Sequence, residues 1–132
     1  MRIVILGCGK LGSRLAMNLS EAGHQIVIMD RDPESLKKLG PNFAGETLAG
    51  SVFIEANIGR IFEVKADVFI ALTDKDNVNI MFAQWVQKRF KVPRVISRVY
   101  DPILARSYRE IGLETVCPTN ITLEAVQLML KN

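Results

Sequence analysis

Three glycines stand in the pattern G-x-G-x-x-G, directly after a short apolar run and before a segment with helical spacing. This arrangement predicts a loop that holds phosphate groups. Gly7 permits a sharp turn, Gly9 lets backbone N–H groups approach a pyrophosphate, and Gly12 lets the following helix pack closely on the strand. A helix that begins here adds unpaired N–H donors and a partial positive charge, both of which favour an anion.

The residues between these glycines, Cys8, Lys10 and Leu11, complete the candidate cofactor-binding loop. Lys10 stands where an ammonium group reaches a β- or γ-phosphate, and the alternative is a solvated lysine on the first helical turn. A helix N-terminus can lower a thiol pKa, so Cys8 is either a redox-sensing thiol or a small residue that fills a tight loop. We expect Cys117 at a strand end roughly 14 Å away, beyond disulfide reach.

An acidic residue, Asp30, closes the next apolar run about 20 residues after the loop, the spacing typical of a ribose-binding carboxylate. It can accept hydrogen bonds from both ribose hydroxyls and would repel a 2′-phosphate, which favours NAD, ADP, ATP or AMP over NADP. Arg31 either stacks on the adenine face, serves a 2′-phosphate or faces water. The alternative to nucleotide binding is a βαβ unit that keeps this geometry without a ligand.

Strands and helices alternate along the chain. We expect strands at 2–6, 25–30, 47–49, 68–72, 95–99 and 114–116, and helices at 11–22, 33–39, within 54–62, and at 76–90, 102–111 and 122–130. Continuous apolar strands between amphipathic helices predict a parallel sheet covered on both faces. Right-handed crossovers then give a Rossmann-like, doubly wound α/β fold with strand order 3-2-1-4-5-6. The ligand crevice is expected where that order reverses, at the carboxyl ends of the first and fourth strands.

Further candidate site residues follow the fourth and fifth strands at the same crevice. Leu72 ends the fourth strand, and Thr73 can hydrogen-bond a phosphate or a ribose. Asp74 and Asp76 would repel bare phosphates, and the alternative for either is to cap the helix that follows. Arg98 ends the fifth strand, where its guanidinium can clamp a phosphate or form an interface salt bridge.

The composition limits the classes of function. The chain has 132 residues, enough for one domain, with 48% apolar residues and a formal charge of +3. That mild charge comes without a nucleic-acid-binding motif, so no nucleic-acid partner is expected. No apolar run approaches the length that spans a bilayer, and the chain runs directly into a strand. We therefore expect an intracellular, soluble domain with no direct membrane insertion.

The sequence argues against catalysis. The single histidine, His24, follows the first helix at the end far from the crevice, and there is no serine-histidine-acid set or metal-ligand cluster. Binding without turnover is therefore the prediction, with no catalytic and no metal-binding residue assigned. Two alternatives remain: the cofactor-binding half of an NAD-dependent dehydrogenase that lacks its substrate domain, and a dimeric scaffold whose site has lost its ligand.

Two helices carry apolar residues on more than one face, which predicts contact with a partner or unusually deep burial. These are the long helix 76–90, with Ile80, Met81, Phe82, Trp85 and Val86, and the last helix, about 120–131, with Ile121, Leu123, Val126, Leu128 and Met129. We expect both to form a dimer surface. The alternative is a well-buried edge helix.

Taken together, these features resemble the RCK domain (regulator of K⁺ conductance, also called the TrkA-N or KTN domain). The resemblance runs through residues 7–12, 29–34, 66–79, 92–99 and 111–112, nearly the whole chain. The run A-D-x-x-I-A-L-T-D-x-D-x-x-N at 66–79 is much more specific than the glycine pattern. The resemblance implies one nucleotide-binding domain over residues 1–132, which binds NAD(H), ATP, ADP or AMP and gates a K⁺ channel or transporter.

The resemblance also implies a setting and partners. Such domains are cytoplasmic, lie at the inner face of the membrane through a pore subunit, and form dimers, commonly assembled into octameric rings. By motif, the three glycines line the phosphates and Asp30 holds the ribose. Lys10 matches a position near the terminal phosphates, and Arg98 a basic position that faces the cleft.

The chain departs from the family at two positions. After Gly50 the family usually has an aspartate or asparagine that helps to hold the adenosine, whereas this chain has Ser51 and then Val52. We retain both as candidate cofactor-binding residues. After Pro118, where some relatives have a metal-coordinating glutamate, this chain has Thr119, so the resemblance assigns no metal ligand here.

Overall fold

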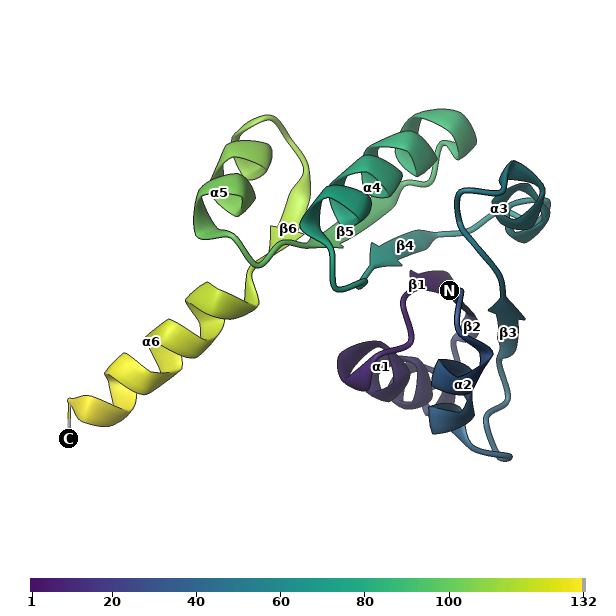
Figure 1. The fold of residues 1–132 in the computed structure, drawn as a ribbon, viewed down its shortest axis with the longest axis horizontal. Coiled ribbons are helices and arrows are strands. Elements are labelled where there is room, and N and C mark those ends of the chain that lie inside the picture. Colours follow the sequence, from purple (N-terminus) through teal and green to yellow (C-terminus); the bar gives the residue numbers. More distant parts are fainter. Residues whose placement is uncertain (132) are drawn as a thin grey trace.

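The computed structural model describes residues 1–131 and contains one sheet of six parallel strands in the order β3-β2-β1-β4-β5-β6 (Figure 1). The strands are β1 (Arg2–Leu6), β2 (Gln25–Asp30), β3 (Glu46–Ala49), β4 (Val68–Ala71), β5 (Arg94–Arg98) and β6 (Glu114–Val116). The predicted doubly wound α/β fold and its strand order are confirmed. The order reverses between β1 and β4, which places a crevice at their carboxyl ends.

Helices cover both faces of the sheet. They are α1 (Lys10–Glu21), α2 (Pro33–Leu36) with the 3₁₀ turn η1 (Lys37–Leu39), α3 (Glu55–Ile61), α4 (Asp76–Phe90), α5 (Pro102–Glu110) and α6 (Pro118–Leu130). Alternate strand residues point to opposite faces. One apolar core therefore joins the sheet to α1 and η1, and the other joins it to α3, α4 and α5. Figure 1 shows α1 and α2 on the face opposite α3 and α4.

The first helix packs on the sheet through small side chains. Its buried residues are Gly12, Ser13 and Ala16, whereas Leu11 is 47% exposed. Leu11, Leu15 and Leu19 stand at helical spacing in the sequence, but they do not form the centre of this contact, although Leu15 and Leu19 pack at the margin of the core. At Gly12 the helix lies so close to the end of β1 that a Cβ would overlap the Gly7 carbonyl oxygen, the close packing expected of the third glycine of this pattern.

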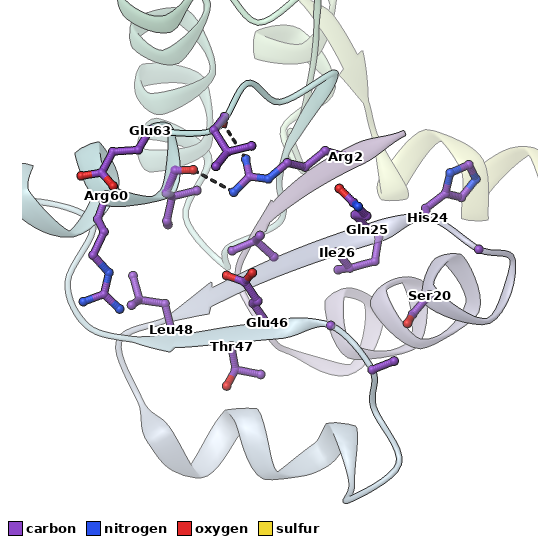
Figure 2. Close-up of a pocket in the computed structure, with 16 residues that line it drawn as sticks. Arg2, Ser20, His24, Gln25, Ile26, Glu46, Thr47, Leu48, Arg60 and Glu63 are labelled. Carbon is purple, nitrogen blue, oxygen red and sulfur yellow. Dashed lines mark hydrogen bonds between the residues drawn. The ribbon is translucent and has the colours of Figure 1, made fainter.

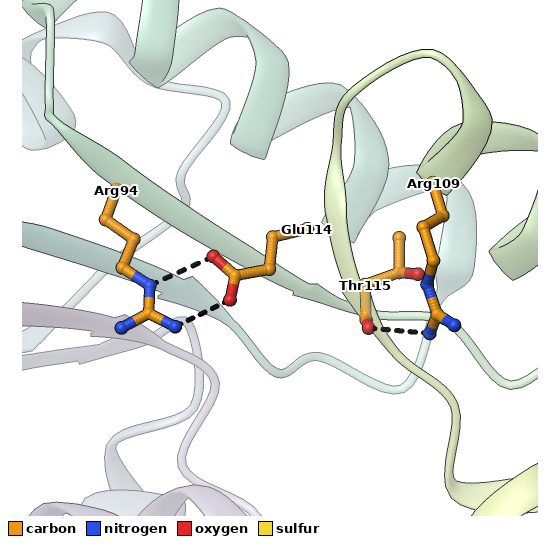
Figure 3. A network of polar contacts seen from close by, with 4 residues as sticks. All are labelled: Arg94, Arg109, Glu114 and Thr115. Atoms are coloured by element: carbon orange, nitrogen blue, oxygen red, sulfur yellow. Dashed lines mark hydrogen bonds and ion pairs between the residues drawn. The ribbon is translucent and has the colours of Figure 1, made fainter.

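Side chains fasten the three-residue edge strand β6. Nε and Nη2 of Arg94 donate to both carboxylate oxygens of Glu114, at 3.0 and 2.6 Å (Figure 3). Nη2 of Arg109 donates to the carbonyl oxygen of Thr115 at 3.1 Å. The hydrogen bond from Arg94 lowers the pKa of Glu114, since it favours the charged carboxylate.

The two helices expected to form a dimer surface differ in the structure. In α4, Ile80, Phe82 and Val86 are buried in the chain's own core, and Met81 is 46% exposed. The expectation for α4 is therefore wrong for most of the apolar residues on which it depended. In α6 none of the described residues is buried, and the helix extends away from the sheet (Figure 1). It begins at Pro118, earlier than predicted, because proline's fixed φ suits a first helical position.

Candidate functional site

A cavity of about 380 Å³ lies where the strand order reverses. Most of the predicted site residues line it: Gly7, Gly9, Asp30, Arg31, Ser51, Val52, Leu72, Thr73, Asp74 and Arg98. Four others, Cys8, Lys10, Leu11 and Gly12, do not. Sequence reasoning missed Leu6, Met29, Ser35, Gly50, Phe53, Lys75 and Val78, which also line it. Several of these directly flank predicted residues in sequence, so adjacency to a predicted residue was the available signal.

The three glycines of the loop serve different purposes. Gly7 has φ +105°, and a Cβ there would lie 2.7 Å from the carbonyl oxygen of Leu72. A Cβ on Gly12 would overlap the carbonyl oxygen of Gly7. Gly9 has an ordinary φ of −80°, and a Cβ there would meet no protein atom within 4 Å. The chain's own packing therefore requires Gly7 and Gly12 but not Gly9, which lines the cavity.

The start of α1 leaves backbone donors free. Gly9 is the N-cap, and the first intrahelical bond runs from the N–H of Ser13 to the carbonyl oxygen of Gly9 at 3.0 Å. Along residues 1–131, the N–H groups of Gly9, Lys10 and Leu11 have no protein acceptor within hydrogen-bond distance. These are the orphan donors of a helix N-terminus, and they favour an anion.

The carboxylate of Asp30 is held at the cavity by the backbone. Its Oδ2 accepts the N–H of Cys8 at 2.8 Å, and its Oδ1 accepts the N–H of Asp32 at 2.9 Å. The backbone of Asp30 also accepts the N–H of Gly50 at 3.0 Å, which fastens the next loop of the cavity. A carboxylate has about four acceptor positions, so two hydroxyl donors can still bind it. The Cys8 amide, by contrast, is already used and is not free for a phosphate.

The Cys8 thiol is fully buried, and its Sγ donates to the carbonyl oxygen of Ser35 at 3.4 Å. Burial raises its pKa, the Asp30 carboxylate raises it further, and the Lys38 ammonium opposes this. The redox-sensing alternative for Cys8, which depends on a lowered pKa, is therefore not favoured, because desolvation of the thiolate is the largest cause of the shift. The small-residue interpretation of Cys8 fits the structure. Sequence reasoning also missed Lys38, whose Nζ donates to the carbonyl oxygen of Cys8 at 3.3 Å.

Arg98 lines the opposite wall of the cavity and is only 8% exposed. Its Nη2 donates to the carbonyl oxygens of Leu72 and Thr73, at 2.7 and 2.8 Å. Its guanidinium carbon lies 4.9 Å from the centroid of the Tyr100 ring. Within residues 1–131 it has no carboxylate partner, and its Nε has no acceptor. A buried cation with no anionic partner favours an anionic ligand.

The loop after β4 is organised by Asn79, a fully buried residue of α4. Its Oδ1 accepts both the N–H and the hydroxyl of Thr73, at 2.9 and 2.6 Å. Its Nδ2 donates to the carbonyl oxygens of Thr73 and Arg98, each at 2.9 Å. The hydroxyl proton of Thr73 is therefore engaged inside the protein. Asn79 is the last residue of the 66–79 run that carried the family resemblance, but its role could be seen only in the structure.

The expectation that Asp74 or Asp76 caps α4 is wrong. The N-cap is Lys75, and no side chain caps the helix. Asp76 is the first helical residue, and its carboxylate accepts the N–H groups of Tyr100 and Asp101, at 2.8 and 3.0 Å. The Asp76 carboxylate therefore accepts backbone N–H groups from the loop after β5 instead of the N–H groups at the start of α4. Ser51, similarly, uses its hydroxyl locally and accepts the N–H of Phe53 at 3.2 Å.

A second cavity, of about 540 Å³, lies around the amino-terminal ends of β2 and β3 (Figure 2). His24 lines it, far from the glycine loop as predicted, and its Nδ1 lies 3.1 Å from the N-terminal nitrogen. Arg2, also in its wall, donates to the carbonyl oxygens of Ile61 and Val64, at 2.8 and 2.9 Å. These bonds anchor the end of α3, so Arg2 has a structural role here.

Two features are absent from residues 1–131. None of the helices there is both long and apolar enough to cross a membrane. No group of three or more histidine, cysteine, aspartate or glutamate side chains in the same part of the chain could hold a metal ion.

The sheet, the glycine loop and the acid that ends β2 define the class of Rossmann-type domains that carry a nucleotide-binding fingerprint. Within this class, the chain belongs to the TrkA-N domain family, which matches residues 3–119. The RCK/TrkA-N resemblance seen in the sequence is thereby confirmed.

Proteins named Trk system potassium uptake protein TrkA are among its relatives. The one from Streptomyces coelicolor is 38% identical over 122 residues, which cover 92% of this chain and 55% of that protein. The one from Mycobacterium tuberculosis is 30% identical over 102 residues, which cover 77% of this chain and 46% of that protein. The chain thus spans about half the length of these relatives, or less.

Solved structures share the fold at low sequence identity. The GsuK channel bound to NAD matches 98% of this chain and 23% of its own, with a TM-score of 0.81 and 17% identity. The AMP-bound Kef C-terminal domain of Shewanella denitrificans matches 98% of this chain and 82% of its own, with a TM-score of 0.71 and 19% identity. At these identities the likeness establishes the fold alone.

Proposed function

We propose that this domain binds an adenine nucleotide, NAD(H), ATP, ADP or AMP, in the cavity at the carboxyl ends of β1, β2 and β4, without chemical turnover. The phosphates would meet the free amides of Gly9, Lys10 and Leu11, with the Lys10 ammonium close by. Asp30 would accept the ribose hydroxyls, and Arg98 would face the ligand's negative charge from the opposite wall.

One observation carries this proposal. Gly9 lines the cavity with ordinary backbone angles and open space where a side chain would be, whereas packing accounts for Gly7 and Gly12. A glycine that the fold does not need is explained by a ligand that must come close to the backbone. The free amides beside Gly9 and the buried Arg98 guanidinium, whose Nε has no acceptor among residues 1–131, also favour binding of a negatively charged phosphate.

We further propose that the nucleotide regulates a K⁺ channel or transporter, and that the protein is a cytoplasmic regulatory subunit held at the membrane by that pore subunit. The TrkA-N family and the names of its potassium-uptake relatives support this role. We also propose that residues 1–132 form one domain whose last helix packs on a second copy, as a dimer or within an octameric ring. The apolar residues of α6, none of them buried by its own chain, support this assembly.

Calorimetry of the purified chain with ATP, ADP, AMP, NAD and NADH tests the binding proposal. We expect saturable binding of at least one nucleotide and weaker binding of NADP than of NAD, because Asp30 repels a 2′-phosphate. No heat with any of these ligands at millimolar concentration would overturn it. Exclusive binding of dinucleotides together with hydride transfer to an added substrate would favour the dehydrogenase alternative instead.

Two further measurements test the partners. Sedimentation should show a dimer or larger assembly that Val126→Asp and Leu128→Asp dissociate, whereas Gln127→Asp, on the same exposed helix, leaves it intact. A monomer in every case would contradict the assembly. Rubidium uptake by vesicles that hold the pore subunit from the same genome should change when this protein and its nucleotide are added, and an unchanged flux would contradict the regulatory role.

A further inference from the structure

Tyr100 lies at a junction between the cavity and the last helix. Its ring covers the Arg98 guanidinium, with 4.9 Å from the guanidinium carbon to the ring centroid. Its N–H donates to Oδ1 of Asp76 at 2.8 Å. Its carbonyl oxygen accepts the hydroxyl of Thr119 at 2.8 Å and the thiol of Cys117 at 3.5 Å. One residue therefore contacts the cavity's arginine, the start of α4 and the start of α6.

The direction of α6 depends on its first turn. None of its described residues is buried, so packing against its own chain does not hold it. Among residues 1–131, the bond from Thr119 to Tyr100 is the one side-chain hydrogen bond that joins α6 to the rest of the domain. A shift of the Tyr100 peptide is therefore expected to move the first turn of α6 and, in the proposed assembly, the second copy on which the helix packs.

The other side of Tyr100 responds to the cavity. Arg98 is shared between the carbonyl oxygens of Leu72 and Thr73 and the Tyr100 ring, while its buried Nε has no acceptor. An anion that accepts a hydrogen bond from Nε would draw the guanidinium toward itself. This would change the contact between the guanidinium and the Tyr100 ring, because the cation–π attraction depends on where the cation lies over the ring. Asp76 directly follows the cavity-lining segment Thr73–Lys75, and its Oδ1 accepts the Tyr100 N–H.

We propose that Tyr100 couples occupancy of the cavity to the orientation of α6, and that the Thr119 hydroxyl is the positioning group that links them. The inference rests on the proposed nucleotide binding and adds a route from that site to the helix. Coupling between two sites is reciprocal. Removing the Thr119 hydroxyl must therefore alter nucleotide affinity, although Thr119 does not line the cavity.

The test compares the full chain with Thr119→Val, which keeps the side chain's shape without its donor, and Thr119→Ser, which keeps the hydroxyl. Calorimetry with NAD and, separately, AMP measures affinity. Hydrogen exchange of peptides that span 117–130 measures the local opening of α6. In the native chain we expect the nucleotide to change exchange in this segment. In Thr119→Val that response should disappear and affinity should change about fivefold or more, and Thr119→Ser should restore both.

The outcomes are distinct. Native-like affinity and native-like exchange response in Thr119→Val overturn the coupling while nucleotide binding stands. A faster exchange of α6 in Thr119→Val at unchanged affinity also overturns it, because that result shows a purely structural role. Failure of the native chain to bind any nucleotide overturns the proposed function, and the coupling with it. Tyr100→Leu is a second test variant. It removes the ring that contacts Arg98 but keeps the backbone carbonyl that accepts the Thr119 hydroxyl, so the response of α6 to the nucleotide should also disappear.

Discussion

The backbone N–H of Cys8 donates a hydrogen bond to Oδ2 of Asp30 at 2.8 Å. This bond joins the glycine loop after β1 to the end of β2, so the two halves of the fingerprint position one another. The Asp32 N–H fixes the second carboxylate oxygen at 2.9 Å. The carboxylate is therefore preorganised at the cavity before a ligand arrives, which reduces the cost of ordering it on binding.

Asp30→Ala is expected to weaken every adenosine ligand by about 1–3 kcal/mol, because it removes a charged hydrogen-bond acceptor. Calorimetry with the ligand that binds the native chain measures this. Asp67→Ala is the matched control, since Asp67 accepts the N–H of Arg2 at 2.8 Å near the other end of β1. That change should leave affinity unaltered. Equal affinities of Asp30→Ala and the native chain would show that the ribose assignment is wrong.

Gly9→Ala and Gly12→Ala are expected to separate binding from folding. At Gly9 a methyl group meets open space, so the free energy of unfolding should change by less than about 1 kcal/mol while nucleotide binding falls. At Gly12 the methyl group overlaps the Gly7 carbonyl, so overpacking should cost about 1–3 kcal/mol or more. Urea denaturation and calorimetry of both variants check this. Undiminished binding by Gly9→Ala would remove the main support for the cavity as a phosphate site.

Asn79→Ala should destabilise the fold by about 3 kcal/mol or more. It deletes the fully buried amide that serves Thr73 and Arg98, and each lost bond leaves a partner unsatisfied. Asn77→Ala is the control on the same helix, because Asn77 is exposed and accepts the neighbouring Val78 N–H. Chemical denaturation compares the two. If both variants are equally stable, Asn79 does not organise the cavity wall.

The Cys8 thiol should resist alkylation in the folded chain. It is fully buried, and its pKa is raised by burial and by the Asp30 carboxylate, so little reactive thiolate forms near neutral pH. We expect iodoacetamide to react ~100-fold or more slowly than with the chain in urea. Mass spectrometry locates the modified residue, and Cys8→Ser provides the control. A rate like that of an exposed thiol would revive the redox-sensing alternative.

The pair formed by Arg94 and Glu114 should make stability depend on pH. The Glu114 pKa is lowered in the folded chain, so its contribution is present above the unfolded-state pKa and is lost as the pH falls through the folded value. Glu114→Gln should therefore be less stable than the native chain at pH 7, and the difference should shrink toward pH 3. Thermal unfolding of the native chain and of Glu114→Gln at each pH measures this difference in stability. Glu63→Gln, without an ion pair among residues 1–131, should show no such trend.

Local patterns predicted most of the fold. Apolar runs, proline at helix starts and glycine at turns depend on a few adjacent residues, and the expected elements agree with the structure within a few residues for most of the chain. The greatest shift of a boundary is at Pro118, which begins α6 although the sequence pattern suggested a start near residue 122. There the first turn is too polar to show helical periodicity, and proline's own preference was the better guide.

Local rules failed where a distant group competed. Asp76 follows the pattern of a helix cap, but the loop at Tyr100 and Asp101 supplies better-placed donors. Cys8 stands at a helix N-terminus, but its pKa is raised, with burial the largest cause and the Asp30 carboxylate, from the end of β2, the next. The apolar residues of α4 and α6 look alike in the sequence, yet only those of α4 meet a sheet and neighbouring helices.

The sequence by itself determined the alternation of strands and helices, the strand order and the phosphate-binding fingerprint, because each depends on backbone preferences and apolar spacing along short segments. Only the tertiary structure decided which candidates share one cavity, that Asp30 is held by the loop after β1, that Asn79 bonds to the ends of β4 and β5, and that α6 extends from the domain with none of its described residues buried. These facts depend on which residues meet after folding, and hydrogen bonds between distant segments leave no signature in the spacing of a single segment.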